Sequence, residues 1–318
     1  MSKHEAKYYS AKIGMSRVSR QVIRKIEAIE TLEGDGVTVR RSIGTPQLPN
    51  LPPFLILDHF NISHVGSGFP DHPHRGQTTW TLLLDGHVQH EDCDGRAGVI
   101  GPGDLQVMRA GSGIVHAEMP KHFDDAGNRL ENPEGLQLWV DLPKKAKKAP
   151  STYQDMKGQD LPVVKGDGWS VKVIAGKSHG EESPVKTPEQ GGTWFLDVRV
   201  QPDGKLFQEL PVGWTAFMYT LGPGSVKIGG GESDMPPFHT LVLDDSVDGE
   251  GVFIEHAGGE DEARLVLFAA QKLDQEVYQY GPFVLSEESD IRQAIVDYQR
   301  GQNGFERAPG FRSKIGGL

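Results

Sequence analysis

Two short pairs of residues carry the clearest chemical signal in this sequence: His72 with His74, and His116 with Glu118. Within each pair the residues are two positions apart, so on a β-strand both side chains point to the same face. Two such strands lying side by side would bring three imidazoles and one carboxylate into one space. This donor set suits a transition-metal ion better than calcium or magnesium, which prefer oxygen ligands. Four ligands on an octahedral ion leave two positions open, so the pattern predicts metal-dependent redox chemistry.

Turn signals indicate that both pairs lie on strands. The stretches Gly101-Pro102-Gly103-Asp104 and Ala110-Gly111-Ser112-Gly113 precede the His116 pair. Pro73 cannot donate to a sheet ladder, so its segment is expected at a strand end or edge, where a site can open to solvent. Further residues could line a cavity, orient ligands or form apolar walls, although structural roles are equally open to them. These weaker candidates are Asp58, His59, His90, Gln106, Gln137, Met108, Trp139 and Phe69.

Composition favours an all-β fold. The 318 residues include 40 glycines and 21 prolines, which favour many turns and short strands. Tight strand spacing without intervening helices predicts antiparallel sandwiches or barrels, and the strand order of the first half broadly repeats in the second. The expected strands are 37–41, 54–58, 78–84, 87–91, 98–100, 104–109, 114–119, 136–142, 170–175, 193–200, 215–221, 225–228, 240–243, 252–256 and 265–269.

One helix is expected near the end of the chain. Ser289 or Asp290 can cap its start, and Gly301 stands where a left-handed stop belongs. A single apolar stripe follows the helical period: Ile291, Ala294, Ile295 and Tyr298.

Three regions are expected: an N-terminal extension over 1–35, a metal-binding domain over 36–150 and a second β-rich domain with the helix and tail over 151–318. The extension is basic with a partial helical period, and we interpret it as partly disordered, with an organelle leader as the alternative. The lysine-rich stretch Pro143–Pro150 is interpreted as a solvated linker, with a nuclear-localisation signal as the alternative.

The net charge and the cysteine content limit the expected binding partners and cellular compartment. The net charge of −11 argues against direct nucleic-acid binding, because phosphates would be repelled. The single cysteine, Cys93, cannot form an internal disulfide, which favours an intracellular compartment, and we interpret it as a spare thiol in a polar loop. No apolar run is long enough to span a membrane, and no secretory signal is visible.

Several motifs agree in order with one known family. Over about residues 20–318 the sequence resembles the pirins. The resemblance is carried by Arg40-Arg41-Ser42-Ile43-Gly44, Pro70-Asp71-His72-Pro73-His74-Arg75-Gly76, Gly103-Asp104-Leu105-Gln106, Gly113-Ile114-Val115-His116-Ala117-Glu118-Met119, Gly135-Leu136-Gln137-Leu138-Trp139-Val140, Asn303-Gly304-Phe305-Glu306-Arg307 and Ser313-Lys314-Ile315-Gly316.

The resemblance implies a bicupin: two cupin-type antiparallel β-barrels with a short C-terminal helix. It also implies one iron ion (Fe²⁺ or Fe³⁺) in the N-terminal barrel, with the ligands His72, His74, His116 and Glu118. The second barrel would be metal-free and His239 structural, although Phe238-His239-Thr240 stands where a ligand strand might be. One departure is Thr78, because related pirins have a glutamate four positions after the His-x-His pair.

Two functions of different classes follow from this resemblance. Pirins are similar to quercetin 2,3-dioxygenases, and in that chemistry Glu118 would be the catalytic base that takes the flavonol proton. Pirins are also described as nuclear, redox-responsive co-regulators that act on transcription-factor partners. An isomerase or an enzyme for another small phenolic is a third reading. The resemblance further implies a monomer located in nucleus and cytoplasm.

Overall fold

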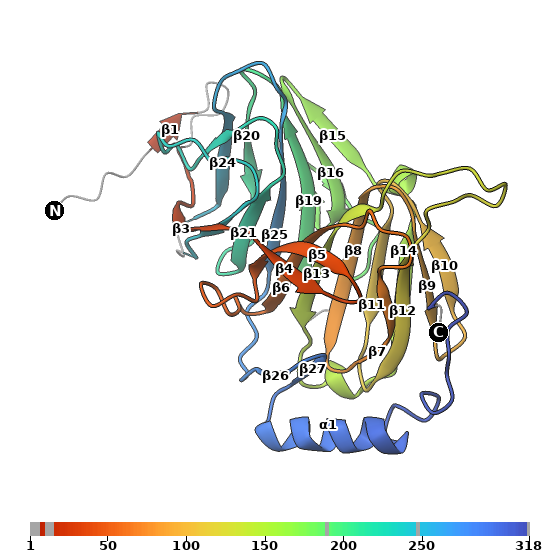
Figure 1. Ribbon diagram of the computed structural model, residues 1–318. Helices are drawn as coiled ribbons and strands as arrows, with labels where there is room; N and C mark the ends of the chain where they lie inside the picture. The colour runs from red at the N-terminus through yellow and green to blue at the C-terminus, as the bar shows by residue number, and fades with distance from the viewer. Residues whose placement is uncertain (1–6, 10–15, 188–190, 246–248, 317–318) are drawn as a thin grey trace. The chain divides into compact units, whose positions relative to one another are not determined.

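The computed structural model describes residues 7–9, 16–187, 191–245 and 249–316, and they form short strands with one α-helix (Figure 1). The chain divides into two compact units. We call Ile29–Asp160 with Leu273–Leu318 the N-terminal barrel, and Met1–Ala28 with Leu161–Lys272 the C-terminal barrel.

The N-terminal barrel has a seven-stranded sheet, in the order β14-β11-β8-β13-β6-β5-β4, and a four-stranded sheet, β10-β9-β12-β7. Every strand pair within these two sheets is antiparallel. The elements of this unit are β4 (Ile29–Glu33), β5 (Val37–Ile43), β6 (Phe54–Asn61), β7 (Phe69–His74), β8 (Gln77–Asp85), β9 (Val88–Asp92), β10 (Ala97–Ile100), β11 (Leu105–Arg109), β12 (Ile114–Pro120), β13 (Glu134–Asp141), the 3-10 turns Ala146–Lys148 and Gly158–Asp160, β14 (Thr152–Met156), β26 (Tyr278–Tyr280), β27 (Phe283–Leu285) and α1 (Glu288–Arg300).

The C-terminal barrel repeats this plan. Its seven-stranded sheet has the order β15-β16-β19-β25-β21-β23-β3, and its smaller sheet the order β20-β24-β22. When the order of this larger sheet is read from its other end, β3 has the position that β14 has in the N-terminal barrel, and β23 has that of β11. In the smaller sheet, β24 has the position of β12. The elements are β1 (Lys7–Tyr9), β2 (Ser16–Val18), β3 (Val22–Glu27), β15 (Val163–Gly166), β16 (Trp169–Ala175), β17 (Lys177–Ser178), β18 (Glu181–Glu182), β19 (Thr193–Val200), β20 (Lys205–Glu209), β21 (Thr215–Thr220), β22 (Val226–Ile228), β23 (His239–Leu243), β24 (Gly251–His256) and β25 (Ala263–Ala270).

The first residues of the chain belong to the C-terminal barrel and the last ones to the N-terminal barrel. The observed boundaries therefore differ from those expected at 35 and 150. Residues 22–27 form strand β3 and pair with β23, so this part of the expected disordered extension completes the C-terminal barrel. Arg20 is fully buried, and its guanidinium donates to the carbonyls of Pro211 and Trp214. Residues 1–6 and 10–15 of the extension lie outside the described residues.

The lysine-rich stretch is also part of the N-terminal barrel, not a solvated linker throughout. Lys147 is buried, is ion-paired with Asp141 and donates to the carbonyls of Gly76 and Val284. A buried ammonium is tolerated only with such partners. Sequence periodicity could not predict the burial of Lys147, because two of its partners, Gly76 and Val284, lie far away in the sequence.

Helix α1 begins two to three residues earlier than its expected caps, Ser289 or Asp290, indicate. Glu287 is the N-cap and makes no side-chain capping bond, while Asp290 lies inside the first turn, where a negative charge favours the helix dipole. The expected stop is confirmed, since Gly301 is left-handed with a φ of 62°. The helix packs with β26 and β27 in the N-terminal barrel.

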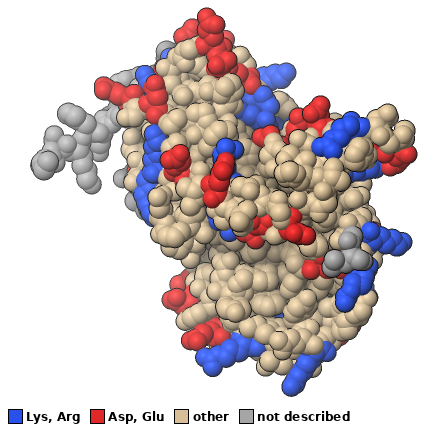
Figure 2. Space-filling view, in the orientation of Figure 1, with Lys and Arg blue, Asp and Glu red and all other residues tan. Residues whose placement is uncertain are grey.

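The fifteen expected strands are all present with shifts of a few residues at their ends, and the all-β class is confirmed. The strands without a separate expectation include β4, β14, β15 and β20, which have exposed or intermediate positions and little apolar signal. No helix in the described part of the chain is long and apolar enough to cross a membrane. On the face drawn in Figure 2, acidic and basic side chains are interspersed.

Candidate metal centre

The N-terminal barrel brings both sequence pairs together. Strand β7 is the edge strand of the smaller sheet, as Pro73 predicts, and pairs with β12 so that His72 lies opposite His116. The register shifts between His116 and Glu118, which marks a β-bulge at the site. Gly76, with a φ of 86°, makes the turn from β7 into β8, where a Cβ would meet the carbonyl of Val284.

His72, His74 and His116 form a compact triad. One ligand nitrogen from each lies within 4.8 Å of the others, and the Nε2 atoms of His72 and His116 are 3.1 Å apart. His74 and His116 are fully buried, whereas His72 is half-buried. The triad is therefore closed on one side and accessible at His72.

The outward nitrogen of each imidazole has a partner. Nδ1 of His72 lies 2.8 Å from the carbonyl of Pro70, and Nδ1 of His74 lies 2.8 Å from the side-chain amide of Gln77. Nδ1 of His116 lies 3.3 Å from the hydroxyl of Tyr153. When the Nδ1–H of His72 donates to the Pro70 carbonyl and that of His116 to the Tyr153 hydroxyl, the Nε2 lone pairs of both are free for a metal ion. The same tautomer of His74 requires the Gln77 amide to turn its Oε1, which has no partner in the described part of the chain, towards Nδ1.

Burial keeps the imidazoles of His74 and His116 neutral. It lowers the pKa of His74 well below the ordinary value, with His72 as the second cause. Burial also lowers the pKa of His116 well below that value, assisted by His72, His74 and His90. Neutral imidazole is the form that binds metal, and Nε2 of His74 is buried with no hydrogen-bond partner in the described part of the chain. The residues present therefore fit a metal ion.

Glu118 lies beside the triad, with its Oε2 4.0 Å from Nε2 of His116. Thr81 donates to Oε1 at 3.3 Å, and the amide of Gln137 donates to Oε2 at 2.9 Å. The indole N–H of Trp139 donates in turn to Gln137 at 3.1 Å. Glu118 falls outside the tight ligand cluster of the three histidines, so its role as fourth ligand stays a prediction.

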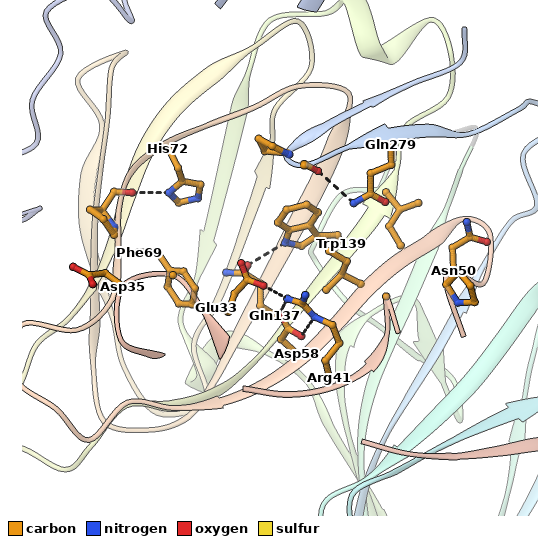
Figure 3. Close-up of a pocket in the computed structure, with 18 of the residues that line it drawn as sticks. Glu33, Asp35, Arg41, Asn50, Asp58, Phe69, His72, Gln137, Trp139 and Gln279 are labelled. Carbon is orange, nitrogen blue, oxygen red and sulfur yellow. Dashed lines mark hydrogen bonds and ion pairs between the residues drawn. The ribbon is translucent and has the colours of Figure 1, made fainter. Parts of the chain in front are cut away.

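A large cavity of about 960 Å³ opens beside this centre, within the N-terminal barrel (Figure 3). His72, Gln137 and Trp139 line it, and Phe69 forms part of the wall. The Trp139 ring also packs edge-on against the imidazole of His74, with centroids 4.9 Å apart. The cavity thus connects the metal-binding side chains to a space large enough for a small aromatic molecule.

Of the weaker candidates, Gln137, Trp139 and Phe69 line the cavity as anticipated, and Asp58 joins them while ion-paired with Arg41. His59 pairs with Glu134 at 2.9 Å and does not line the cavity. The remaining candidates are Gln106 and Met108, whose side chains are buried, and His90.

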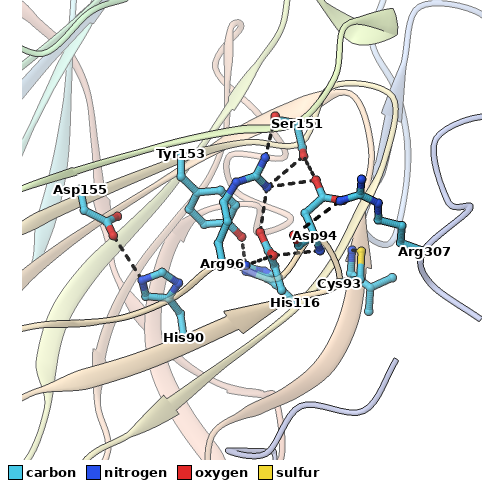
Figure 4. Close-up of polar contacts among 11 residues, drawn as sticks. His90, Cys93, Asp94, Arg96, His116, Ser151, Tyr153, Asp155 and Arg307 are labelled. Atoms are coloured by element: carbon cyan, nitrogen blue, oxygen red, sulfur yellow. Dashed lines mark hydrogen bonds and ion pairs between the residues drawn. The ribbon is translucent and has the colours of Figure 1, made fainter. Parts of the chain in front are cut away.

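His90 lies beside Tyr153, whose hydroxyl contacts His116 (Figure 4). It stacks on Tyr153 with centroids 5.7 Å apart, and its Nε2 lies 3.3 Å from Asp155. Sequence reasoning missed Tyr153 and Gln77, which orient His116 and His74. Gln77 could have been found, because it follows His74 by three residues across a glycine turn, whereas Tyr153 arrives from a distant strand.

The position that departs from related pirins lies off the metal-facing side. On β8, Gln77 contacts His74 and Thr81 contacts Glu118. Strand alternation places Thr78 on the opposite face, together with Trp80. A carboxylate there would not point at the triad, so its absence leaves the metal-binding geometry intact.

Cys93 lies in the turn between β9 and β10, and its Sγ accepts the backbone N–H of Val115 at 3.4 Å. Burial raises the pKa of this thiol, which keeps it protonated and poorly nucleophilic. These contacts agree with the interpretation of a spare thiol.

In the C-terminal barrel, His239 begins β23, the strand that takes the place of β11. The strands in the places of β7 and β12 are β20 and β24, so His239 does not stand on a ligand strand. Its Nδ1 lies 2.8 Å from the carbonyl of Pro237. That His239 has a structural role stays a prediction, because His72 makes the same kind of contact with the carbonyl of Pro70.

Two antiparallel cupin barrels in one chain, one of which holds a histidine triad with two fully buried members, define the class of a bicupin with a candidate metal centre. Family models agree: a Pirin model matches residues 36–140 and a Pirin C-terminal cupin domain model matches residues 195–304. The chain belongs to the pirin family.

Individual relatives extend this result over nearly the whole chain. A pirin-like protein of Solanum lycopersicum is 44% identical over 93% of this chain and 97% of its own length. Pirin of Homo sapiens is 42% identical over 94% of this chain and 99% of its own length. A crystal structure of quercetin 2,3-dioxygenase from Acinetobacter baumannii superposes with a TM-score of 0.79, at 27% identity, over 91% of this chain and 99% of that one.

Proposed function

We propose that this protein is an iron-dependent dioxygenase of the quercetin 2,3-dioxygenase type. The observation that carries the proposal is the triad of His72, His74 and His116, in which the half-buried His72 lines a cavity of about 960 Å³. The structural likeness to a quercetin 2,3-dioxygenase supports it. In the proposed reaction a flavonol and one O₂ give a ring-opened phenolic ester and carbon monoxide.

The three histidines would hold the iron, with Glu118 as fourth ligand. Bound iron would supply Lewis acidity and one-electron chemistry at the substrate hydroxyl. The cavity would hold the flat ligand between Phe69 and Trp139.

Glu118 would accept the proton of the flavonol hydroxyl and make the ligand electron-rich. Two donors, Thr81 and Gln137, hold its carboxylate, and this fixes its direction before substrate arrives. The bond from Trp139 to Gln137 ties this carboxylate to the cavity wall, so a ligand stacked on Trp139 lies close to the base.

The test is anaerobic metal analysis, followed by a quercetin-plus-oxygen assay that records flavonol absorbance and carbon monoxide. We expect one equivalent of iron and steady turnover. Glu118→Gln should lower turnover by a factor of about 100 or more, because a positioned base contributes a factor of this order. Glu181→Gln, an exposed position of the C-terminal barrel, is the matched control and should change nothing.

Iron without turnover would overturn the enzymatic proposal. It would favour the alternative function, a redox-responsive nuclear co-regulator that acts through a transcription-factor partner. Binding of a nuclear partner would then be compared between the ferrous and ferric forms.

A further inference from the structure

The cavity beside the triad has a strongly asymmetric charge. Among the described residues, four carboxylates line it, and the single lining cation is Arg41 (Figure 3). The acidic residues are Glu33, Asp35, Asp58 and Asp71.

Arg41 is not free to receive an anionic ligand. Its guanidinium donates to both carboxylate oxygens of Asp58, at 2.7 and 2.6 Å, and to Glu33 at 2.5 Å. Such a bidentate pair is a strong and geometrically fixed interaction. The cation is therefore committed to the wall of the cavity, and the net charge that faces a ligand is negative.

Two carboxylates remain near the His72 end. Asp35 is exposed, and Asp71 accepts the backbone N–H of Ser313 at 3.1 Å. Carboxylates are acceptors only, so they can bind hydroxyl or ammonium donors but repel anionic groups. Apolar wall residues, Phe69 and Trp139 among them, complete the lining.

We infer that this cavity selects uncharged, flat aromatic ligands that carry hydroxyl donors, and that it rejects derivatives with a fixed negative charge, such as sulfonates. The inference rests on the proposed function for the site, and it adds which chemical form of a phenolic can enter. Negative potential in a cleft with low-dielectric walls is stronger than on an open surface. A conjugated, anionic phenolic would thus be excluded before it reached the triad.

The experiment compares a flavonol sulfonate with the isosteric, uncharged flavonol sulfonamide. Binding to iron-loaded protein without oxygen is followed by quenching of tryptophan fluorescence, because Trp139 lines the cavity. We expect the sulfonate to bind about tenfold or more weakly at low salt, and the difference to shrink as salt rises.

The double variant Asp35→Asn/Asp71→Asn keeps the acceptor oxygens and removes two charges. It should bring the two affinities to within about threefold of each other, provided that its iron content equals that of the parent. Asp125→Asn is the matched control, since Asp125 is exposed on the same unit and does not line the cavity. This control should keep the full difference in affinity between the sulfonate and the sulfonamide.

Equal affinity for the two ligands, a difference that the double variant does not reduce, or no binding of either would overturn the inference. Selective binding without turnover in oxygen would overturn the proposed dioxygenase and support the charge selection. Turnover together with equal affinity for the two ligands would support the proposed dioxygenase and overturn the charge selection. The two proposals therefore fail separately.

Discussion

The two barrels share one strand order but fill their interiors differently. In the N-terminal barrel, the paired strands β7 and β12 carry His72, His74, His116 and Glu118. In the C-terminal barrel, the strands in the same places, β20 and β24, place Leu206, Val252 and Ile254 in a core made of valine, leucine, isoleucine, methionine and alanine.

This difference has an energetic meaning. A buried imidazole stabilises the fold only when its nitrogens have partners, whereas a buried leucine stabilises it by leaving water. The interior of the N-terminal barrel is therefore suited to bind a metal ion, and that of the C-terminal barrel to stability. A substitution in the interior of the N-terminal barrel should mainly lower metal affinity, and one in the interior of the C-terminal barrel should mainly lower the free energy of unfolding.

The largest effect is expected at the triad. His116→Ala removes a ligand nitrogen and should lower metal affinity by more than the roughly 10–100-fold that changes around a ligand produce. Metal analysis after dialysis checks this, with His239→Ala of the C-terminal barrel as the control that keeps full loading. Equal metal content in both variants would break the comparison between the barrels.

A smaller effect is expected in the apolar core. Leu267 is fully buried, so Leu267→Ala should lower the free energy of unfolding by about 2–5 kcal/mol without changing metal affinity per folded molecule. Denaturant unfolding measures the first quantity and metal titration the second. Leu32→Ala, at a side chain that is 82% exposed, is the control and should cost less than about 0.5 kcal/mol. A comparable loss in both variants would contradict the assignment of this core.

The smallest effect concerns acid sensitivity in the N-terminal barrel. Burial raises the pKa of Asp297, but hydrogen bonds outweigh it, above all the one from Arg75 at 2.8 Å, and bring the pKa to about 2. Because the folded pKa lies below the ordinary value of 3.8, the stabilisation is present above about pH 4 and is lost as the pH falls towards 2.

Asp297→Asn should therefore reduce the free energy of unfolding by on the order of 2 kcal/mol at pH 7, and this deficit should shrink between pH 4 and pH 2. Denaturant titrations over that range measure it. Glu131→Gln, at an exposed loop position of the same unit, is the control and should leave the free energy of unfolding within about 0.5 kcal/mol of the parent. A deficit that does not vary with pH would show that packing, and not charge, is what Asp297 provides.

Much of the site could be predicted from local pattern. The spacing of His72 with His74 and of His116 with Glu118 places each pair on one strand face, because side chains alternate along any strand. The turn glycines and Pro73 located the strand ends and the sheet edge. These features depend on neighbours in the sequence, so the sequence carries them directly.

The partners that arrive from distant segments could not be predicted this way. Tyr153 reaches His116 because β14 pairs with β11, in the stretch that had been assigned to the second domain. Likewise β3 pairs with β23, although its apolar pattern suggested a helix. Short strands with few buried residues have little local signal, and only the sheet edge that they complete determines their structure.

The sequence by itself determined the strand class, the faces of the paired residues and the chemistry of the donors, since these follow from residue type and period. Only the tertiary structure decided that Gln77 and Tyr153 hold two of the imidazoles, that Gln137 holds Glu118, and that four carboxylates line the cavity together with an arginine that is ion-paired with two of them. The physical reason is that hydrogen bonds and charge at a site depend on distance in space, and strand pairing joins residues that no local period connects.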